Sequence, residues 1–391
     1  SKDNCTLENS NQIVYSNITQ HEPLYLCSGL SNYLPLDEWD TLTFPNSIYV
    51  YRVGSELAVI DLEISFIRNT ANFYILFDDC LEGYTVAIFN RIHGFITNNG
   101  LQGKFIFLSG NRDVNEEYSA WRKKNSLDKA FEVFYNSNWY YRVKQNVGDF
   151  KLKKRPIDKT EWFMCLNNRL HPHRAMSVTY MDHLGLLEKG KVTCLDKDYG
   201  ENAYVCNFED RMFSFSAQFD KQHVDILRHQ ASITSKKLPL SLDTEDFALG
   251  SRPHDYNPEF YNKTLINVVT ETYYQKDFGQ QGMMFFSEKI WKSIALKQIF
   301  ILIGPQYGLK YLKELGFSTY GDFIDESYDE LDDGQRLFAA IDALNKTMKT
   351  YTVDELNEAT RQRRQHNFKI LMSRIPQRTL CKDITKLLRT L

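Results

Sequence analysis

The chain has 391 residues, which is enough for two or three domains whose cores need no disulfide stapling. Hydrophobic residues make up 42% and charged residues 25%, so a wholly disordered or fibrous chain is excluded. The 47 basic and 50 acidic side chains leave a net charge of −3, and no overall positive field favours nucleic acid or an anionic membrane. Because the cysteines form no Cys-x-x-Cys pair and no apolar run could span a membrane, we expect a cytoplasmic protein with reduced thiols.

Strand-like runs alternate with helical patterns through the first half of the chain. The β-branched and aromatic runs lie at residues 47–53, 72–79, 104–109 and 131–135. Between residues 84 and 98, apolar side chains recur at the spacing of a helix. This alternation is typical of a mainly parallel sheet flanked by helices, so we assign residues 1–150 to a first Rossmann-like domain.

The same alternation restarts in the second half, after a basic, Pro-containing linker at residues 144–159. Strands are expected at 161–166, 264–270 and 300–305, and helices at 172–187, 288–296 and 309–315. We assign residues 151–345 to a second domain of this kind. The predicted fold class is therefore α/β, with two doubly wound Rossmann-like domains that face each other across a ligand-binding cleft.

Charge is segregated near the end of the chain. Residues 321–334 are strongly acidic, whereas residues 361–391 carry nine Lys or Arg side chains against Asp383 alone. We expect residues 346–391 to form a basic helical tail. Its cationic face is expected to dock on an acidic part of the same chain, and contact with nucleic acid or anionic lipid is the alternative.

The first segment with chemical potential runs from a strand through a polar loop into a helix start. It contains Asn167, Arg169, His173 and Arg174. A helix N-terminus at the carboxyl end of a parallel strand favours an anion, and the planar guanidinium of Arg174 suits phosphate oxygens. The alternative is that Arg174 pairs with a carboxylate across the helix. No metal is expected here, because Pro172 should turn the His171 and His173 rings apart.

The second segment follows the expected strand 264–270. Ser287 is placed to cap a helix whose first turn contains Glu288 and Lys289. A cation is disfavoured at the positive end of a helix, so Lys289 indicates a nearby anion. We therefore predict that Arg174 and Lys289, from distant segments, clamp one diphosphate, with Glu288 accepting ribose hydroxyls.

At these residues the sequence resembles a known family. Asn167 and Arg174 in the order N-x6-R open a helix, a strand ends in Thr-Glu, and F-[ST]-E-K-x-x-K follows. This order resembles the donor-binding domain of α1,3-fucosyltransferase-like glycosyltransferases of the GT-B fold, and glycosyltransferase-like proteins encoded by bacteriophages. The resemblance covers residues 160–335. One departure is Thr272, where the fucosyltransferases usually have Asn.

The resemblance implies that the chain transfers a sugar from a nucleotide-diphosphate sugar to an acceptor hydroxyl, without a metal or another cofactor. Residues 1–150 would then bind the acceptor and residues 151–345 the donor. In this interpretation Arg174 and Lys289 bind the pyrophosphate, and Glu271 and Tyr273 line the sugar site. The full predicted donor set is Asn167, Arg169, His173, Arg174, Glu271, Tyr273, Ser287, Glu288, Lys289 and Lys292.

Sugar transfer also needs a base for the acceptor hydroxyl. We expect it among Asp78, Asp79 and Glu82, which lie where a strand of the first domain ends. A competing signal is the Asp196-Lys-Asp198 arrangement, by which glycosyltransferases of the other major fold hold a divalent metal. Its position before a Tyr-Gly pair favours a simple turn.

Two questions stay open at this point. The acceptor is either a hydroxymethylated base in phage DNA or a surface glycan; the basic segments favour DNA and the net charge opposes it. The alternative to an enzyme is a non-catalytic protein that binds a nucleotide sugar or a glycan. Such a protein would keep the phosphate clamp and lack the base.

Overall fold

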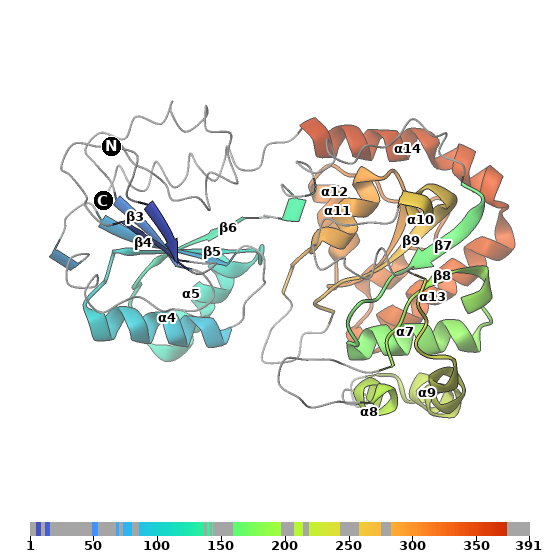
Figure 1. Ribbon diagram of the computed structural model, residues 1–391, viewed down its shortest axis with the longest axis horizontal. Coiled ribbons are helices and arrows are strands. Elements are labelled where there is room, and N and C mark those ends of the chain that lie inside the picture. Colours follow the sequence, from blue (N-terminus) through green and yellow to red (C-terminus); the bar gives the residue numbers. More distant parts are fainter. Residues whose placement is uncertain are drawn as a thin grey trace. The chain divides into compact units, whose positions relative to one another are not determined.

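The computed structural model describes residues 5–8, 12–15, 49–53, 68–69, 73–79, 86–136, 139–140, 143, 159–196, 207–213, 219–242, 258–274 and 283–373. The chain divides into two compact units (Figure 1). Unit 1 comprises Ser1–Tyr141, Asp277–Phe285 and Ile375–Leu391, and unit 2 comprises Arg142–Lys276 and Phe286–Arg374. The expected boundary at residue 150 lies outside the described residues.

Unit 1 is built on a parallel four-stranded sheet. Its strands are β3 (Tyr49–Val53), β4 (Phe73–Asp79), β5 (Phe105–Ser109) and β6 (Glu132–Tyr135), adjacent in that order. Helices α4 (Val86–Asn99) and α5 (Val114–Asn125) cover one face of it (Figure 1). The strands and the helix expected in this half are present. A separate antiparallel pair consists of β1 (Cys5–Glu8) and β2 (Gln12–Tyr15).

The core of unit 1 is largely aromatic. On α4, Phe89, Ile92 and Ile96 recur at helical spacing and are completely buried. The ring of Phe89 lies 5.3 Å from that of Tyr118 and 5.7 Å from that of Trp121, both on α5. These contacts fix both helices against the sheet, and so place the loop after β5 at its carboxyl edge.

Unit 2 contains a second parallel sheet, of order β10-β9-β7-β8. The strands are β7 (Glu161–Cys165), β8 (Gly190–Val192), β9 (Thr264–Thr270) and β10 (Ile299–Ile303). Every residue of β9 and β10 is buried, as a strand covered on both faces requires. The chain has an α/β fold with two Rossmann-like parallel sheets, as the alternation predicts.

Helices cover both faces of the sheet of unit 2, with α7 and α13 on one face and α11 and α14 on the other (Figure 1). The helices are α7 (Pro172–His183), α8 (Phe208–Phe213), α9 (Lys221–Thr234), α10 (Pro258–Lys263), α11 (Glu288–Ala295), α12 (Gly308–Glu314), α13 (Asp333–Thr350) and α14 (Val353–Ser373). Short 3₁₀ turns are η1 (Leu187–Lys189), η3 (Ser235–Lys237) and η4 (Ser327–Glu330).

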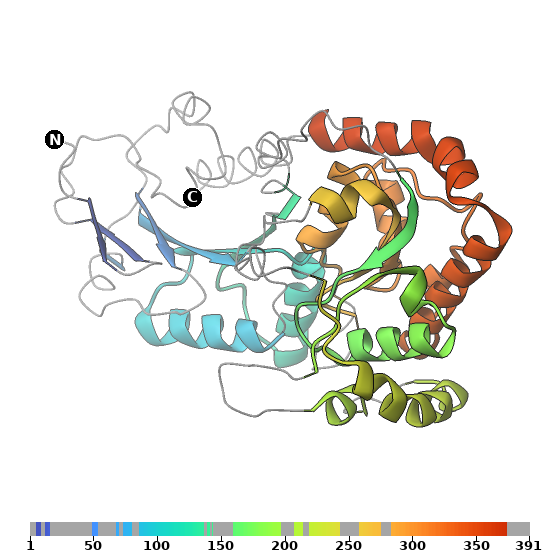
Figure 2. The same ribbon diagram turned by 45° about the vertical axis from the view of Figure 1, so that its right-hand side comes forward.

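Helix α7 is shorter than the expected span of 172–187. It ends at His183 because Gly185 adopts φ +66°, a left-handed conformation that glycine reaches without strain. The last turn is tied to α9, which lies alongside α7 (Figure 2), through Asp182. The Asp182 carboxylate accepts bonds from Gln230 at 3.0 Å and Thr234 at 2.8 Å. This fixes the direction in which the other end of α7 points.

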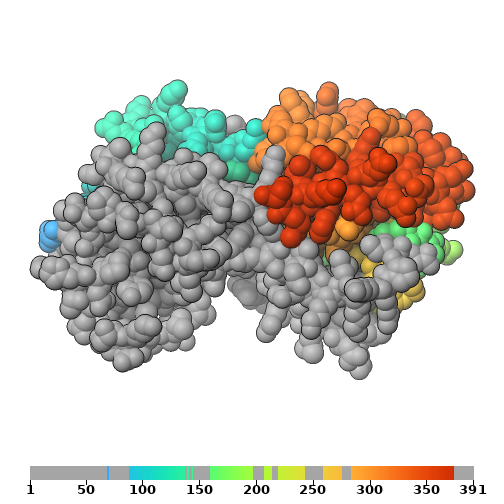
Figure 3. All heavy atoms as spheres, turned by 90° about the horizontal axis from the view of Figure 1, so that it is seen from above, coloured from blue at the N-terminus to red at the C-terminus, as the bar shows by residue number. Residues whose placement is uncertain are grey.

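Residues 346–373 form the end of α13 and all of α14, which packs against α11 and appears as a red band at the surface (Figure 3). Arg363 pairs with Asp322 of the acidic segment and donates to the Thr319 carbonyl at 2.7 Å. Arg364 donates to the Lys297 carbonyl at the end of α11, at 2.9 Å. These arginines dock on their own chain, which was the favoured interpretation of the tail. Residues 374–391 lie outside the described part.

In the part of the chain that the structure describes, no helix combines the length and the hydropathy needed to cross a membrane.

Candidate anion-binding site

The predicted donor residues lie at the carboxyl edge of the sheet of unit 2. After β7 the chain adds β8 on one side, and it later adds β9 on the other side of β7. The reversal makes the gap between β7 and β9 a topological switch point, where open α/β sheets bind ligands. Helix α7 begins seven residues after β7, and α11 is the helix that follows the strand β9. Two helix N-termini therefore belong to this edge.

Asn167 links the three strands at this edge. Its main-chain N–H donates to Thr193 Oγ1 at 2.7 Å and its Nδ2 to the Thr193 carbonyl at 3.0 Å, beyond β8. Its Oδ1 accepts a bond of 2.6 Å from Thr270 Oγ1, on β9. Since both ends of the amide already have partners, Asn167 holds the edge together, and its expected contact with the donor stays a prediction.

The first turn of α7 faces the end of β9. His171 is the N-cap residue and forms no side-chain cap, and Pro172 follows in the first turn as expected. His173 Nε2 donates to the Glu271 carbonyl at 2.9 Å, and its ring stacks on Tyr274 with centroids 5.2 Å apart. The expectation that Pro172 turns the two imidazoles apart is wrong. The rings stack at 5.7 Å, because both pack into the buried edge beside the sheet.

Arg174 is 97% buried and points at the end of β9. Its Nη2 donates to the Thr270 carbonyl at 3.3 Å and lies 3.5 Å from the Glu271 carbonyl, while Nη1 reaches the Arg169 carbonyl at 3.4 Å. Burial lowers the pKa of Arg174 to about 10, so it stays cationic at neutral pH. Its partners are carbonyls rather than a carboxylate across the helix, and its Nε has none among the described residues.

Helix α11 starts at the cap that the sequence predicts. The Ser287 hydroxyl accepts a bond from the Lys289 main-chain N–H at 3.4 Å. Ser287 in turn donates from its N–H to Glu271 Oε2 at 3.1 Å and from its hydroxyl to the same oxygen. Glu271 is fully buried, and burial raises its pKa although Lys289 and Ser287 oppose the shift.

Lys289 keeps its ammonium group near the start of its own helix. Its Nζ lies 3.1 Å from Ser287 Oγ and 3.3 Å from Glu288 Oε1, with a quarter of the side chain exposed. Burial acts to raise the pKa of Glu288, but Lys289 and Lys292 outweigh it and hold that pKa below its ordinary value. Glu288 is therefore a carboxylate at neutral pH, which is the form that accepts hydroxyl bonds.

Four cations act on one imidazole at the centre of this edge. The pKa of His171 is lowered to about 3, first by burial and then by Arg174, Arg211, Lys289 and Arg169. The contacts agree with this list: Arg211 Nε donates to the Leu170 carbonyl at 3.0 Å, Arg174 Nη2 lies 3.5 Å from the Glu271 carbonyl, and Lys289 Nζ lies 3.1 Å from Ser287 Oγ. Arg174 and Lys289 both lie beside Glu271, the first at its carbonyl and the second through Ser287, and their joint binding of one diphosphate stays a prediction. Arg211 was missed, because the short helix that carries it gave no sequence signal.

The neighbouring helix start, that of α12, has no room for an anion. The Asp329 carboxylate accepts bonds from the main-chain N–H groups of Leu309 at 2.9 Å and Lys310 at 3.0 Å. Gly308 packs against β10, where an added Cβ would lie 2.6 Å from Leu302 Cδ2. The chain supplies its own anion at α12, whereas α7 has no side-chain cap.

The remaining predicted residues are only partly placed. Arg169 is exposed, Tyr273 is half-buried and Lys292 is buried. Asp78 and Asp79 end β4, where their backbones pair with Leu108 and Ser109 of β5. Glu82 and Asp198 lie outside the described residues. Among the described residues, no group of three or more His, Cys, Asp or Glu side chains is arranged so that it could hold a metal ion.

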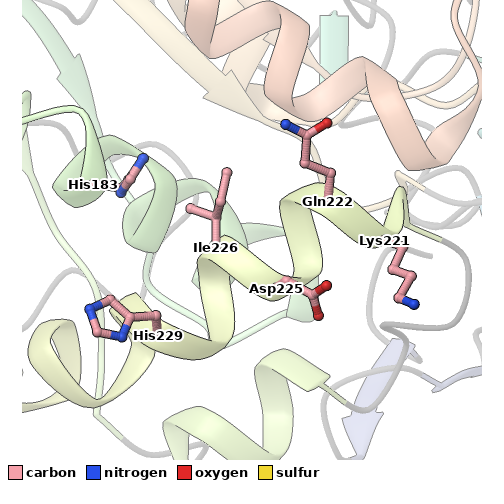
Figure 4. A pocket seen from close by; sticks show the side chains of 6 residues that line it. All are labelled: His183, Lys221, Gln222, Asp225, Ile226 and His229. Atoms are coloured by element: carbon pink, nitrogen blue, oxygen red, sulfur yellow. The ribbon is translucent and has the colours of Figure 1, made fainter.

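A separate open pocket of about 730 Å³ lies at the other end of α7, against α9 (Figure 4). Its lining side chains are His183, Lys221, Gln222, Asp225, Ile226 and His229. The length of α7 places this pocket about 15 Å along the helix from the cationic edge. It contains none of the predicted donor residues.

No protein-family model and no curated protein matches the chain. Solved structures of similar chain path include the α,α-trehalose-phosphate synthase (UDP-forming) of Burkholderia vietnamiensis, with a TM-score of 0.45, 11% identity, and coverage of 91% of this chain and 74% of that one. The α,α-trehalose 6-phosphate synthase of Burkholderia multivorans has a TM-score of 0.43 and 10% identity, and the match covers 90% of this chain and 74% of that one. A glycosyltransferase of Rickettsia africae has a TM-score of 0.39 and 11% identity, and the match covers 96% of this chain and 84% of that one. At these values the substrates of those enzymes say nothing about this chain.

Proposed function

We propose that the protein is a glycosyltransferase of the GT-B type, which binds the diphosphate of a nucleotide sugar at the cationic edge of unit 2. The supporting observation is geometric: Arg174 and Lys289 both adjoin Glu271, and Arg211 donates to the carbonyl of the residue before His171, at a switch point where two helices begin. An excess of buried and half-buried cations beside uncapped helix N–H groups is the arrangement that an anion stabilises. The resemblance to fucosyltransferase-like and phage proteins supports the same ligand class.

In this proposal the edge acts on the leaving group. As the bond between the sugar and the diphosphate breaks, negative charge grows on the diphosphate, and Arg174 and Lys289 neutralise it. Glu288, held as a carboxylate, orients the ribose through its hydroxyls. The acceptor oxygen forms the new bond to the sugar carbon and passes its proton to a carboxylate, for which Asp78, Asp79 and Glu82 stay the proposed candidates. No metal is required for these steps.

The acceptor we favour is a glycan hydroxyl rather than a base in DNA. The basic tail is one of the two segments that favour DNA as the acceptor. Two arginines of this tail, Arg363 and Arg364, form ion pairs or hydrogen bonds with other residues of the same chain. The donor sugar and nucleotide are to be found by a thermal-shift panel of UDP and GDP sugars. A ligand at 100 times its dissociation constant stabilises the fold by about 2.7 kcal/mol.

The substitutions Arg174→Ala and Lys289→Ala test the clamp. We expect each to weaken inorganic pyrophosphate binding by about 10- to 100-fold, because each removes a charge-assisted contact. Titration calorimetry measures the affinity. Lys310→Ala is the matched control, since Lys310 sits at the start of α12, where Asp329 already occupies the N–H groups. Pyrophosphate affinity unchanged in both test variants would refute the proposed site.

Release of nucleoside diphosphate separates an enzyme from a binding protein. A glycosyltransferase slowly hydrolyses its cognate donor with water as acceptor, and that release should fall with pyrophosphate affinity in the two variants. Tight donor binding with no release over hours would favour the non-catalytic alternative.

A further inference from the structure

One residue, Glu271, contacts the starts of both helices at the anion-binding site. It is the first residue after β9. Its main-chain carbonyl accepts the 2.9 Å bond from His173 Nε2 and lies 3.5 Å from Arg174 Nη2, both on α7. Its carboxyl oxygen Oε2 accepts two bonds from Ser287, the N-cap of α11. The backbone of this residue therefore fixes one helix start and its side chain fixes the other.

Packing alone does not account for a carboxyl group at this position. Glu271 is completely buried, and a Cβ at Gly304 would lie 3.2 Å from its Cγ, so the neighbouring strand end closes tightly over it. Its second oxygen, Oε1, has no hydrogen-bond partner among the described residues. A buried carboxyl oxygen without a partner destabilises a fold, and an apolar side chain would avoid this cost.

The link from Glu271 runs on to the cation. Lys289 Nζ donates to Ser287 Oγ at 3.1 Å, and that hydroxyl donates its own proton to Glu271 Oε2. Arg174 reaches the same residue through its carbonyl. The two groups that are proposed to hold the diphosphate are thus tied to opposite sides of one residue.

We propose that Glu271 is a positioning residue, which sets the register between the starts of α7 and α11 and so the spacing of Arg174 and Lys289. This inference rests on the proposed function. It differs from the role that the family resemblance implies, in which Glu271 lines the sugar site, because here its carboxyl acts through Ser287 rather than on the ligand.

The chain offers a matched control on the same two elements. Asn267, also on β9, donates from Nδ2 to Ser293 Oγ of α11 at 2.7 Å. Like Glu271, it is a buried polar residue that ties β9 to α11, but its partner lies about one and a half turns beyond the helix start. Asn267→Ala therefore removes a comparable bond without changing the position of the N-cap.

The experiment measures inorganic pyrophosphate affinity by calorimetry in Glu271→Ala, Glu271→Gln and Asn267→Ala. We expect Glu271→Ala to lose about 10- to 100-fold, whereas Asn267→Ala stays within about 3-fold of the unmodified protein even if it melts earlier. Glu271→Gln keeps a carbonyl oxygen for Ser287 and should restore affinity to within about 3-fold. If Glu271→Ala does not fold, Ser287→Ala replaces it, with the same loss expected.

Two results would overturn the positioning role. One is a loss of pyrophosphate affinity that is equal in Glu271→Ala and Asn267→Ala. The other is an unchanged affinity in Glu271→Ala, or in Ser287→Ala where that variant replaces it. The failure of the proposed function looks different. In that case the unmodified protein binds no pyrophosphate, or Arg174→Ala binds it as well as the unmodified protein does.

Discussion

Glu117, on α5 in unit 1, shows how burial changes the pKa of an acid outside the proposed anion-binding site. Its Oε2 accepts a 2.9 Å bond from Asn111 Nδ2. The pKa is raised to about 7, first by burial and then by the charges of Asp113 and Glu116, against the effect of the Asn111 bond. Folding therefore favours the protonated acid. The stability that this acid contributes is complete below its unfolded pKa of 4.5, and it is lost as the pH rises through about 7.

We expect Glu117→Gln, which cannot ionise, to gain about 1–2 kcal/mol of unfolding free energy relative to the unmodified protein between pH 4.5 and pH 8. Denaturant unfolding at several pH values measures the difference. Asn115→Ala is the control, because Asn115 is exposed on the same helix and carries no ionisable group, so its effect on unfolding free energy should not change with pH. A difference that stays constant across this range would contradict the shift.

Among the elements, α12 shows what happens when a helix start is occupied by its own chain. Asp329 is buried and accepts two main-chain bonds there. Asp329→Ala should cost about 1–2 kcal/mol of unfolding free energy, the value of a lost cap. Thermal or denaturant unfolding measures it. Asp325→Ala removes an exposed turn contact to Ser327 and should cost less than about 0.5 kcal/mol. Equal losses in the two variants would show that the cap is unimportant.

The individual helices and strands were the part of the fold that the sequence predicted best. The fully buried strands β5, β9 and β10 are runs of five to seven residues, mostly apolar or β-branched, that the local sequence indicates, and the Ser287 cap is a local signal as well. Contacts between distant residues could not be predicted. Asn167 has its amide occupied by Thr193 and Thr270, which lie 26 and 103 positions along the chain. Nothing near Asn167 in the sequence indicates these bonds, and its expected contact with the donor stays a prediction.

At the scale of the whole molecule, charge bears on the acceptor. The net charge is −3, and the described arginines Arg363 and Arg364 are paired internally. We expect binding to hydroxymethylated duplex DNA no tighter than the non-specific range of about 10⁻⁴ to 10⁻⁶ M at physiological salt. Fluorescence anisotropy at several salt concentrations measures it, with unmodified duplex as control. Nanomolar binding that collapses with salt would restore the DNA acceptor.

The order of segments within the two units limits how the protein can be dissected. Unit 1 includes Asp277–Phe285, which lies in the chain between two parts of unit 2, and the Met284 carbonyl accepts a 2.9 Å bond from the Arg112 N–H. No single cut in the gene separates the two units. A fragment ending at Tyr141 would leave the Arg112 N–H without this acceptor, and a fragment starting at Arg142 would carry Met284 without its donor. The inserted segment ends at Phe285, two residues before the Ser287 cap. Exchanging one unit for that of another protein would need four junctions, one at each boundary between the segments of the two units.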